Sequence, residues 1–243
     1  MLIWTVVAPL LGASCHVLAD ETLGCLVVDP GAGAAPQVEE LVRRHGLTPR
    51  GVAVTHGHVD HTWDAAALGD LYGIPVFVHR EDEPRFHEPF TTLGPLGEQL
   101  RQMADHAGLG TYRAPGDVRT FDGDAELPLL DGAVQARHLP GHTGGSTVYV
   151  VADAPATGSA LPPASGADAG RVDDLTHVWL TGDVLFAGTI GRTDLPGGDP
   201  TAMAASLGRF ADWEGPALVL PGHGPRSRSD VEFATNPYLA RRT

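Results

Sequence analysis

The chain has 243 residues, of which 42% are hydrophobic and 19% are charged. This composition is close to that of an average globular protein, which excludes a disordered or fibrous chain. The formal net charge of −14 argues against nucleic acid and an anionic membrane as partners, because both attract basic surfaces. We expect a single domain over residues 1–243. The composition leaves the oligomeric state unknown.

Cysteine usage and the N-terminal segment both favour a cytoplasmic protein. Cys15 and Cys25 form neither a disulfide framework nor a Cys-x-x-Cys pair, so we expect two buried free thiols in a reducing compartment. The apolar start MLIWTVVAPLLGASC lacks the basic region of a signal peptide and predicts a pair of strands instead. No run approaches the roughly eighteen apolar residues that span a bilayer. We therefore expect no membrane partner.

Short apolar strands and amphipathic helices alternate along the chain. Strands are predicted at residues 23–28, 51–55, 74–79, 134–138, 147–151, 177–180 and 217–220. Helices are predicted within residues 35–46 and 62–73, around residues 96–107, and after Asp199, which is placed to cap its helix. This alternation is typical of an α/β architecture.

Two segments interrupt the alternation. Residues 152–176 are rich in Ala, Pro, Gly, Ser and Asp and have no periodicity, so they predict a flexible insertion between two strands. A domain linker is the weaker alternative, because candidate ligands lie on both sides. Residues 81–119 are expected to form a helical flap beside the functional site, since loops on a rigid scaffold often set specificity.

The segment VAVTHGHVDH carries four metal-competent side chains directly after an apolar strand: His56, His58, Asp60 and His61. Imidazole and carboxylate ligands suit zinc, iron, manganese or cobalt, and no cysteine lies nearby to favour a softer metal. One ion cannot use the whole cluster and keep an open catalytic position, so the spacing predicts two metals. The alternative is a solvated histidine-rich turn, or a helix start capped by Asp60.

Three further apolar strands each run into one more candidate ligand: His142 in PGHTGGS, Asp183 in TGDVLF and His223 in PGHGP. Singly, each residue is more typical of a turn or loop. Together they complete a two-metal site, because the ends of several strands of one sheet converge in space.

The motifs HGHVDH, PGHTGGS, TGDVLF and PGHGP resemble, in order, the metal motifs of the metallo-β-lactamase superfamily. The resemblance spans residues 55–225 and implies a four-layer αββα sandwich. It implies a first metal on His56, His58 and His142, a second on Asp60, His61 and His223, and Asp183 between them. The H-x-H-x-D-H form resembles the glyoxalase II branch, the hydroxyacylglutathione hydrolases, rather than class B β-lactamases, which commonly place a cysteine among the ligands.

The activity implied by this resemblance is hydrolysis of S-acyl thioesters of glutathione or a related small thiol, by attack of a metal-bridging hydroxide. The cofactors would be two divalent ions, with zinc first and iron or manganese as alternatives. Asp60 and Asp183 would be the catalytic residues, and Asp29 and Thr55 are placed to support the imidazoles from behind. Two alternatives remain open: a mononuclear iron persulfide dioxygenase using His56, His142 and Asp183, and a lactone or β-lactam hydrolase on the same site.

Substrate contacts are predicted at two places. The segment LFAGTIGRTDLPGGDP resembles short hydroxyacylglutathione hydrolases and, more distantly, persulfide dioxygenases. Within it Arg192 either contacts substrate or forms a salt bridge with Asp194. Two-domain glyoxalase II enzymes bind glutathione through a C-terminal helical domain, whereas only residues 224–243 follow His223 here. Arg226 and Arg228 either offer a carboxylate-binding patch or are solvated loop charges.

Overall fold

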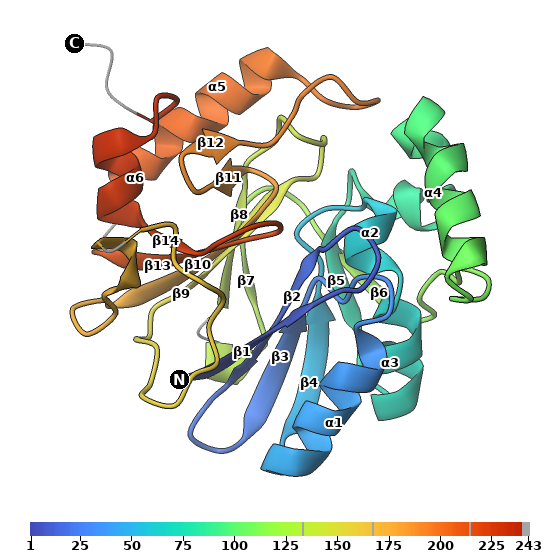
Figure 1. Cartoon of the computed structure of the whole chain (residues 1–243), viewed down its shortest axis with the longest axis horizontal. Coiled ribbons are helices and arrows are strands. Elements are labelled where there is room, and N and C mark those ends of the chain that lie inside the picture. The colour runs from blue at the N-terminus through green and yellow to red at the C-terminus, as the bar shows by residue number, and fades with distance from the viewer. Residues whose placement is uncertain (133, 167, 214, 240–243) are drawn as a thin grey trace.

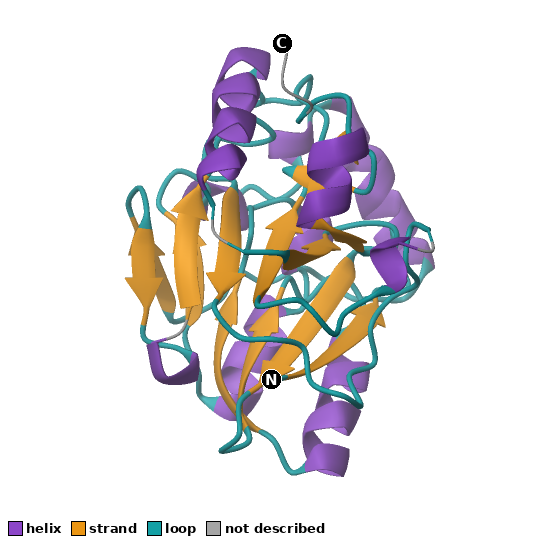
Figure 2. Cartoon of the chain, turned by 90° about the vertical axis from the view of Figure 1, so that its left-hand side faces the viewer, coloured by secondary structure: helices purple, strands orange, loops and turns teal. Residues whose placement is uncertain are grey.

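The computed structural model describes residues 1–132, 134–166, 168–213 and 215–239. Two six-stranded sheets pack face to face, with α-helices on their outer faces (Figures 1 and 2). Helices α1 and α3 lie outside the sheet formed by the N-terminal half, and α5 and α6 lie outside the other sheet (Figure 1). The predicted four-layer αββα sandwich is confirmed.

The first sheet has the strand order β1-β2-β3-β4-β5-β6. Its strands are β1 (Leu2–Val7), β2 (Ser14–Ala19), β3 (Gly24–Val28), β4 (Thr48–Ala53), β5 (Val76–His79) and β6 (Val118–Phe121). The first three strands pair antiparallel, and β3 to β6 pair parallel. The strand pair predicted from the apolar N-terminal segment is therefore present, whereas β6 was not predicted.

The second sheet has the order β14-β13-β10-β9-β8-β7. Its strands are β7 (Ala125–Leu127), β8 (Val134–His138), β9 (Thr147–Val151), β10 (His177–Gly182), β13 (Ala217–Pro221) and β14 (Ser227–Arg228). Strands β10 and β13 pair parallel, and the other described neighbours in this sheet pair antiparallel. A separate hairpin, β11 (Leu185–Phe186) and β12 (Thr189–Ile190), follows β10.

The α-helices are α1 (Ala35–His45), α2 (Val59–Thr62), α3 (Ala65–Tyr72), α4 (Pro95–His106), α5 (Pro200–Arg209) and α6 (Ser229–Thr235). The predicted cap of α5 is present, because the Asp199 carboxylate accepts hydrogen bonds from the backbone N–H groups of Thr201 and Ala202. Helix α6 was not predicted. Among the described residues, no helix has both the length and the apolar character needed to cross a membrane.

The main core lies between the two sheets. Leu26 and Phe77 of the first sheet belong to the same buried cluster as Tyr149, Leu180 and Leu220 of the second. Each sheet is also apolar on its outer face, where α1 and α3 or α5 and α6 cover it. Burial on both faces explains why several strands read as continuous apolar runs. The rigid pair of sheets fixes the loops at the strand ends.

The segment 152–176 runs along the edges of both sheets. Ala160 exchanges backbone hydrogen bonds with Ile3 and Thr5 of β1, at 2.8 and 3.0 Å, and the backbone N–H of Arg226 donates to Pro163 O at 2.9 Å. These contacts cover exposed strand edges. Residue 167 lies outside the described residues, and the flexibility of the segment stays a prediction.

The segment 81–119 contains α4, which lies beside α2 (Figure 1). Leu93 and Ala104 of this segment pack against Val59 and Trp63, in and next to α2. The segment therefore packs against the helix that carries the candidate ligands Asp60 and His61, and its function as a flap stays a prediction.

Candidate metal centre

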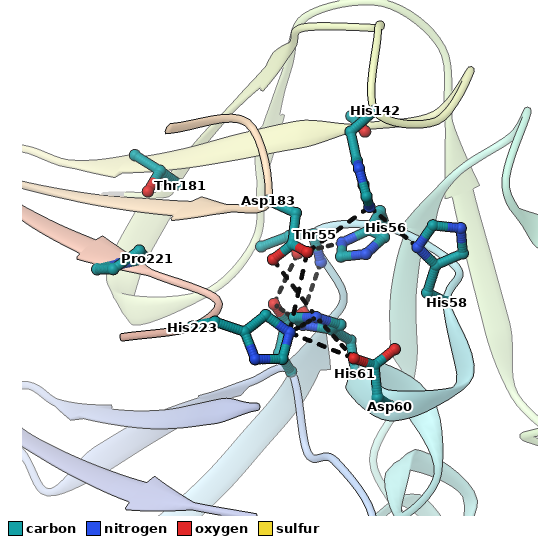
Figure 3. Close-up of polar contacts among 12 residues, drawn as sticks. Thr55, His56, His58, Asp60, His61, His142, Thr181, Asp183, Pro221 and His223 are labelled. Carbon is teal, nitrogen blue, oxygen red and sulfur yellow. Dashed lines mark hydrogen bonds and ion pairs between the residues drawn. The ribbon is translucent and has the colours of Figure 1, made fainter. Parts of the chain in front are cut away.

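The seven predicted ligands converge at one edge of the sandwich (Figure 3). His56 and His58 follow β4, and Asp60 and His61 lie on α2. The remaining three follow strands of the second sheet: His142 after β8, Asp183 after β10 and His223 after β13. The facing edges of the two sheets therefore bring together residues that are up to 167 positions apart in the chain, as between His56 and His223.

A first group consists of His56, His58 and His142, whose candidate ligand nitrogens all lie within 4.8 Å of one another. His142 Nε2 is 3.0 Å from His58 Nδ1. The three residues are only 1%, 3% and 3% exposed. Three converging imidazoles with this degree of burial form a typical divalent-metal site.

A second group consists of Asp60, His61 and His223. His223 Nε2 lies 3.2 Å from His61 Nε2 and 3.2 Å from Asp60 Oδ2. This group is more open than the first, since the side chains of Asp60 and His223 are 15% and 30% exposed.

Asp183 lies between the two groups (Figure 3). Its Oδ1 is 3.5 Å from His61 Nε2, and its Oδ2 is 3.7 Å from His142 Nε2 and 3.8 Å from His223 Nε2. One carboxylate thus faces both groups at once. The glycine before His223 allows this approach, because a Cβ atom at Gly222 would collide with Asp183 Oδ1.

Asp29 and Thr55 hold two of the imidazoles from behind. The Thr55 backbone N–H and hydroxyl donate to Asp29 at 2.7 and 2.6 Å, and His61 Nδ1–H donates to Asp29 Oδ2 at 3.1 Å. Because the Thr55 hydroxyl proton is directed to Asp29, His56 Nδ1–H donates to Thr55 Oγ1 at 3.1 Å. Asp29 also lies close enough to His56 and His61 to join a ligand group, but its oxygens already accept these hydrogen bonds. Asp29 and Thr55 occupy the supporting positions that were predicted.

His142 is held through Arg192, but not by the side chain of that residue. His142 Nδ1–H donates to the backbone carbonyl of Arg192 at 2.8 Å. Nδ1 of His56, His61 and His142 each donates a hydrogen bond to a supporting residue. The other ring nitrogen, Nε2, therefore faces the candidate ligands of the cluster. A neutral imidazole with this tautomer is the form that binds a metal.

The electrostatics of the cluster favour a cation. Burial and the neighbouring imidazoles of His61 and His142 lower the pKa of His56 well below its usual value, which keeps the ring neutral. Burial would raise the pKa of Asp60, but the imidazoles of His61 and His223 hold it well below its usual range. Burial would likewise lower the pKa of His61, yet the carboxylates of Asp60 and Asp183 raise it to about 10. Positive charge at His61 Nε2 is therefore strongly stabilised, and a bound cation would supply it.

Unpartnered buried atoms give a direct test of whether the residues fit metal ions. The buried atoms without a hydrogen-bond partner among the described residues include His56 Nε2 and Asp183 Oδ1, which both face the cluster. Buried polar atoms are rarely left in this state unless a ligand, ion or water satisfies them. The donor set of imidazole nitrogens and carboxylate oxygens fits zinc, iron or manganese.

The predicted substrate residues have different surroundings. Arg192 and Asp194 form an exposed ion pair with N–O distances of 2.6 and 2.7 Å, as one of the two interpretations expected. The guanidinium of Arg226 donates to Gly170 O in the segment 152–176, at 3.2 Å. The assignment of Arg192 and Arg226 as substrate contacts stays a prediction.

Both interpretations of Arg228, an open carboxylate-binding patch and a solvated loop charge, were wrong, because the residue is only 3% exposed. Its buried guanidinium already binds Asp174 and Asp230, at 2.6 and 2.8 Å. Asp82 was not predicted. It is a fully buried carboxylate that accepts hydrogen bonds from the loops that carry His58 and His142. Its only local signal is the three-residue spacing to Arg85, with which it forms an ion pair.

A search of protein families matches residues 8–174 to the metallo-beta-lactamase superfamily. An uncharacterized protein of Mycobacterium leprae is 36% identical over 242 residues, covering 98% of this chain and 99% of that protein. The probable metallo-hydrolase YqgX of Bacillus subtilis is 30% identical, with 96% and 94% of the two chains covered. The hydroxyacylglutathione hydrolase GloC of Haemophilus influenzae is 28% identical, with 93% and 92% covered.

Two solved structures share the whole fold. TTHA1623 in a di-iron-bound form is similar with a TM-score of 0.72 and 28% identity, over 97% of this chain and 99% of that chain. The B3 metallo-beta-lactamase BLEG-1 is similar with a TM-score of 0.70 and 26% identity, over 99% and 100%. With the αββα sandwich and the converging His and Asp groups, these matches show that the chain belongs to the metallo-beta-lactamase superfamily of metal-dependent hydrolases.

Proposed function

We propose that the protein is a two-metal thioester hydrolase that acts on S-acyl derivatives of glutathione or a related small thiol. The observation that carries this proposal is the pair of ligand groups with Asp183 between them. A single-iron dioxygenase on His56, His142 and Asp183 would leave the second group without a function. The similarity to GloC, which is named a hydroxyacylglutathione hydrolase, supports a thioester. The similarity to BLEG-1, which is named a B3 metallo-beta-lactamase, supports a β-lactam as the alternative substrate of the same site.

His56, His58 and His142 would hold the first metal, and Asp60, His61 and His223 the second, with Asp183 as a ligand of both. Zinc is the first choice. Iron or manganese suits the same nitrogen and oxygen donors, and the di-iron form of TTHA1623 supports iron as an alternative. Two divalent ions would act as Lewis acids and lower the pKa of bound water, which makes a nucleophile available near neutral pH.

Asp60 orients the attacking water in this proposal. Its Oδ2 faces His223 Nε2, at 3.2 Å, and so points into the second group. Its Oδ1 has no hydrogen bond to any other described residue and is free to accept one from water. A carboxylate that binds with one oxygen and directs the nucleophile with the other combines two functions in one side chain.

A thioester suits the chemistry of this cluster. The leaving group is a thiolate, and because an ordinary thiol has a pKa near 8.5, it departs without a strong acid. An amine leaving group requires a proton donor. The imidazoles of the cluster are directed inward as ligands, so they are poorly placed to donate protons to a departing amine.

We place the thiol carrier next to Arg192. A cavity of about 870 Å³ lies between the segment 190–193 and helices α5 and α6, and its lining includes Arg192, Thr193, Met203 and Phe233 but none of the seven candidate ligands. Arg192 joins it to the centre, because the Arg192 backbone carbonyl accepts a hydrogen bond from His142. This volume suits a small organic ligand. A glutathione carboxylate would replace Asp194 as the partner of the exposed Arg192 guanidinium.

The direct test is thiol release from S-lactoylglutathione by metal-loaded protein, measured with a thiol-reactive dye. The His142→Ala variant serves as the control. We expect release by the wild type and its loss in the variant. A wild type that holds its metals but releases no thiol would contradict the proposal, and oxygen consumption with glutathione persulfide would then identify the dioxygenase.

A further inference from the structure

A fully buried carboxylate, Asp82, joins loops from the two sheets. It lies in the turn after β5, and its exposed fraction is 0%. Its Oδ2 accepts hydrogen bonds from the backbone N–H of Gly57 at 2.7 Å and from the hydroxyl of Thr143 at 2.6 Å. Its Oδ1 accepts from the backbone N–H of Gly145 at 3.0 Å. One side chain therefore connects the end of β4 with the loop between β8 and β9.

The positions of these partners relate Asp82 to one metal group only. Gly57 lies between His56 and His58, and Thr143 follows His142. All three proposed ligands of the first metal are thus next to a partner of Asp82. The second group has a different support, since His61 donates to Asp29.

Close packing leaves little freedom around this carboxylate. A Cβ atom at Gly145 would lie only 2.7 Å from Asp82 Cβ, and one at Gly57 would lie 2.8 Å from the Asp82 carbonyl oxygen. The two glycines allow both loops to touch the Asp82 turn directly. A shift of Asp82 would therefore move both loops.

Arg85 fixes the carboxylate in turn. Its Nε donates to Asp82 Oδ1 at 3.1 Å, and the side chains of Arg85 and Asp82 are 10% and 0% exposed. A second guanidinium nitrogen donates to the carbonyl of Pro196 at 3.0 Å. The pair thereby links the segment 81–119 and the loop after Arg192 to the first group.

We propose that Asp82 and Arg85 are positioning residues that set the geometry of the first metal site without touching a metal. This inference rests on the two-metal proposal above. Residues that hydrogen-bond metal ligands typically contribute 10- to 100-fold to metal affinity or activity, because they fix the orientation of the ligands before the ion binds. Asp82 acts on the same ligands through their chain neighbours, so we expect an effect at the lower end of this range. The expected consequence is a selective loss: replacing the pair weakens the first site and spares the second.

The test uses Asp82→Asn together with Arg85→Gln, so that neither charge is left buried without a partner. The pair of changes is introduced into His223→Ala, which weakens the second site, and into His142→Ala, which weakens the first.

A milder comparison is Thr143→Val, which removes one donor to Asp82, against Thr143→Ser, which keeps the hydroxyl. Glu232→Gln is the structural control, because Glu232 is a buried carboxylate, 1% exposed, that contacts Gly188, Ser227 and Asn236 and no proposed ligand.

Zinc affinity is measured by competition with a chromophoric chelator, and far-UV circular dichroism confirms that each variant is folded. In the His223→Ala background we expect the double change to lower zinc affinity at least tenfold. In the His142→Ala background we expect less than a twofold change. Thr143→Val should also lower the zinc affinity of the first site, whereas Thr143→Ser should leave it unchanged.

Equal affinity losses in both backgrounds, or a comparable loss in Glu232→Gln, would overturn the inference, because they would indicate general destabilisation. Unchanged affinity in the His223→Ala background would also overturn it, while leaving the two-metal proposal intact. A wild type that binds fewer than two zinc ions would overturn both proposals together.

Discussion

The two ligand groups differ in burial and in charge. The first group, His56, His58 and His142, is made of imidazoles only and is at most 3% exposed. The second contains the Asp60 carboxylate, and the side chain of His223 is 30% exposed. Burial shields the first group from solvent, whereas the partly exposed second group is open to water and substrate. The comparison suggests that the first group anchors the centre and that the reaction is directed from the second.

The largest expected effect comes from removing a candidate ligand of the first group. His142→Ala removes one of the three candidate ligands of the first group and leaves the second group complete. We expect kcat/KM for S-lactoylglutathione to fall by about 1000-fold or more, since the metals supply the nucleophile. Steady-state kinetics after metal loading measure this. A loss smaller than tenfold would show that the first group is dispensable.

The next effect concerns the second group. Asp60→Ala removes one ligand and the oxygen that orients water, so both metal content and turnover should fall, the turnover by about 100-fold. Metal analysis and kcat are measured on the same preparation. Unchanged turnover in a variant that has lost its second ion would contradict the function assigned to Asp60.

Removal of the metals by a chelator tests the difference in solvent exposure between the two groups. Because His223 and Asp60 are partly exposed while the first group is buried, a chelator should remove the second ion about tenfold faster than the first. We expect two phases of metal release, with activity lost in the faster one. Release of both ions in a single phase would indicate that the two groups form one kinetic unit.

The smallest effect is expected outside the ligands. Arg192→Gln should raise the KM for a glutathione thioester about fivefold and leave kcat and metal content unchanged, because an exposed ion pair contributes only about 1 kcal/mol. The His142 contact is kept, since it involves the Arg192 backbone. An S-acyl cysteamine, which has no carboxylate, is the matched control substrate and should show no change. Equal increases in KM for both substrates would exclude carboxylate binding by Arg192.

Local pattern was sufficient to predict most of the fold. The apolar runs that became β3, β5 and β9 are buried along their length, so hydrophobicity alone marks them. Strands β6 and β14 and helix α6 were not predicted. None of the four residues of β6 is fully buried, β14 has only two residues, and α6 contains a buried glutamate, Glu232. Burial of Glu232 depends on partners such as Gly188, 44 residues away, and no local pattern reveals such a contact.

In the candidate site, too, some residues could be predicted from local sequence and others depend on distant contacts. The convergence of the seven candidate ligands could be predicted, because their compact motifs follow apolar strands whose ends meet at one edge of the sheets. Asp82 lies in no such motif. Its partners Gly57 and Gly145 are 25 and 63 residues away, and only the packed sheets bring them to one carboxylate. Supporting residues of this kind can be identified only from the tertiary structure, whereas the candidate ligands can be predicted from their positions at strand ends.

Metal stoichiometry tests the central claim most directly. Elemental analysis of the purified wild type, run beside the His223→Ala variant, counts the ions per chain. The two-group centre predicts two ions in the wild type and about one in the variant, because the buried first group keeps its ion. A single iron in the wild type, unchanged in His223→Ala, would contradict the two-metal centre and the hydrolysis proposed for it.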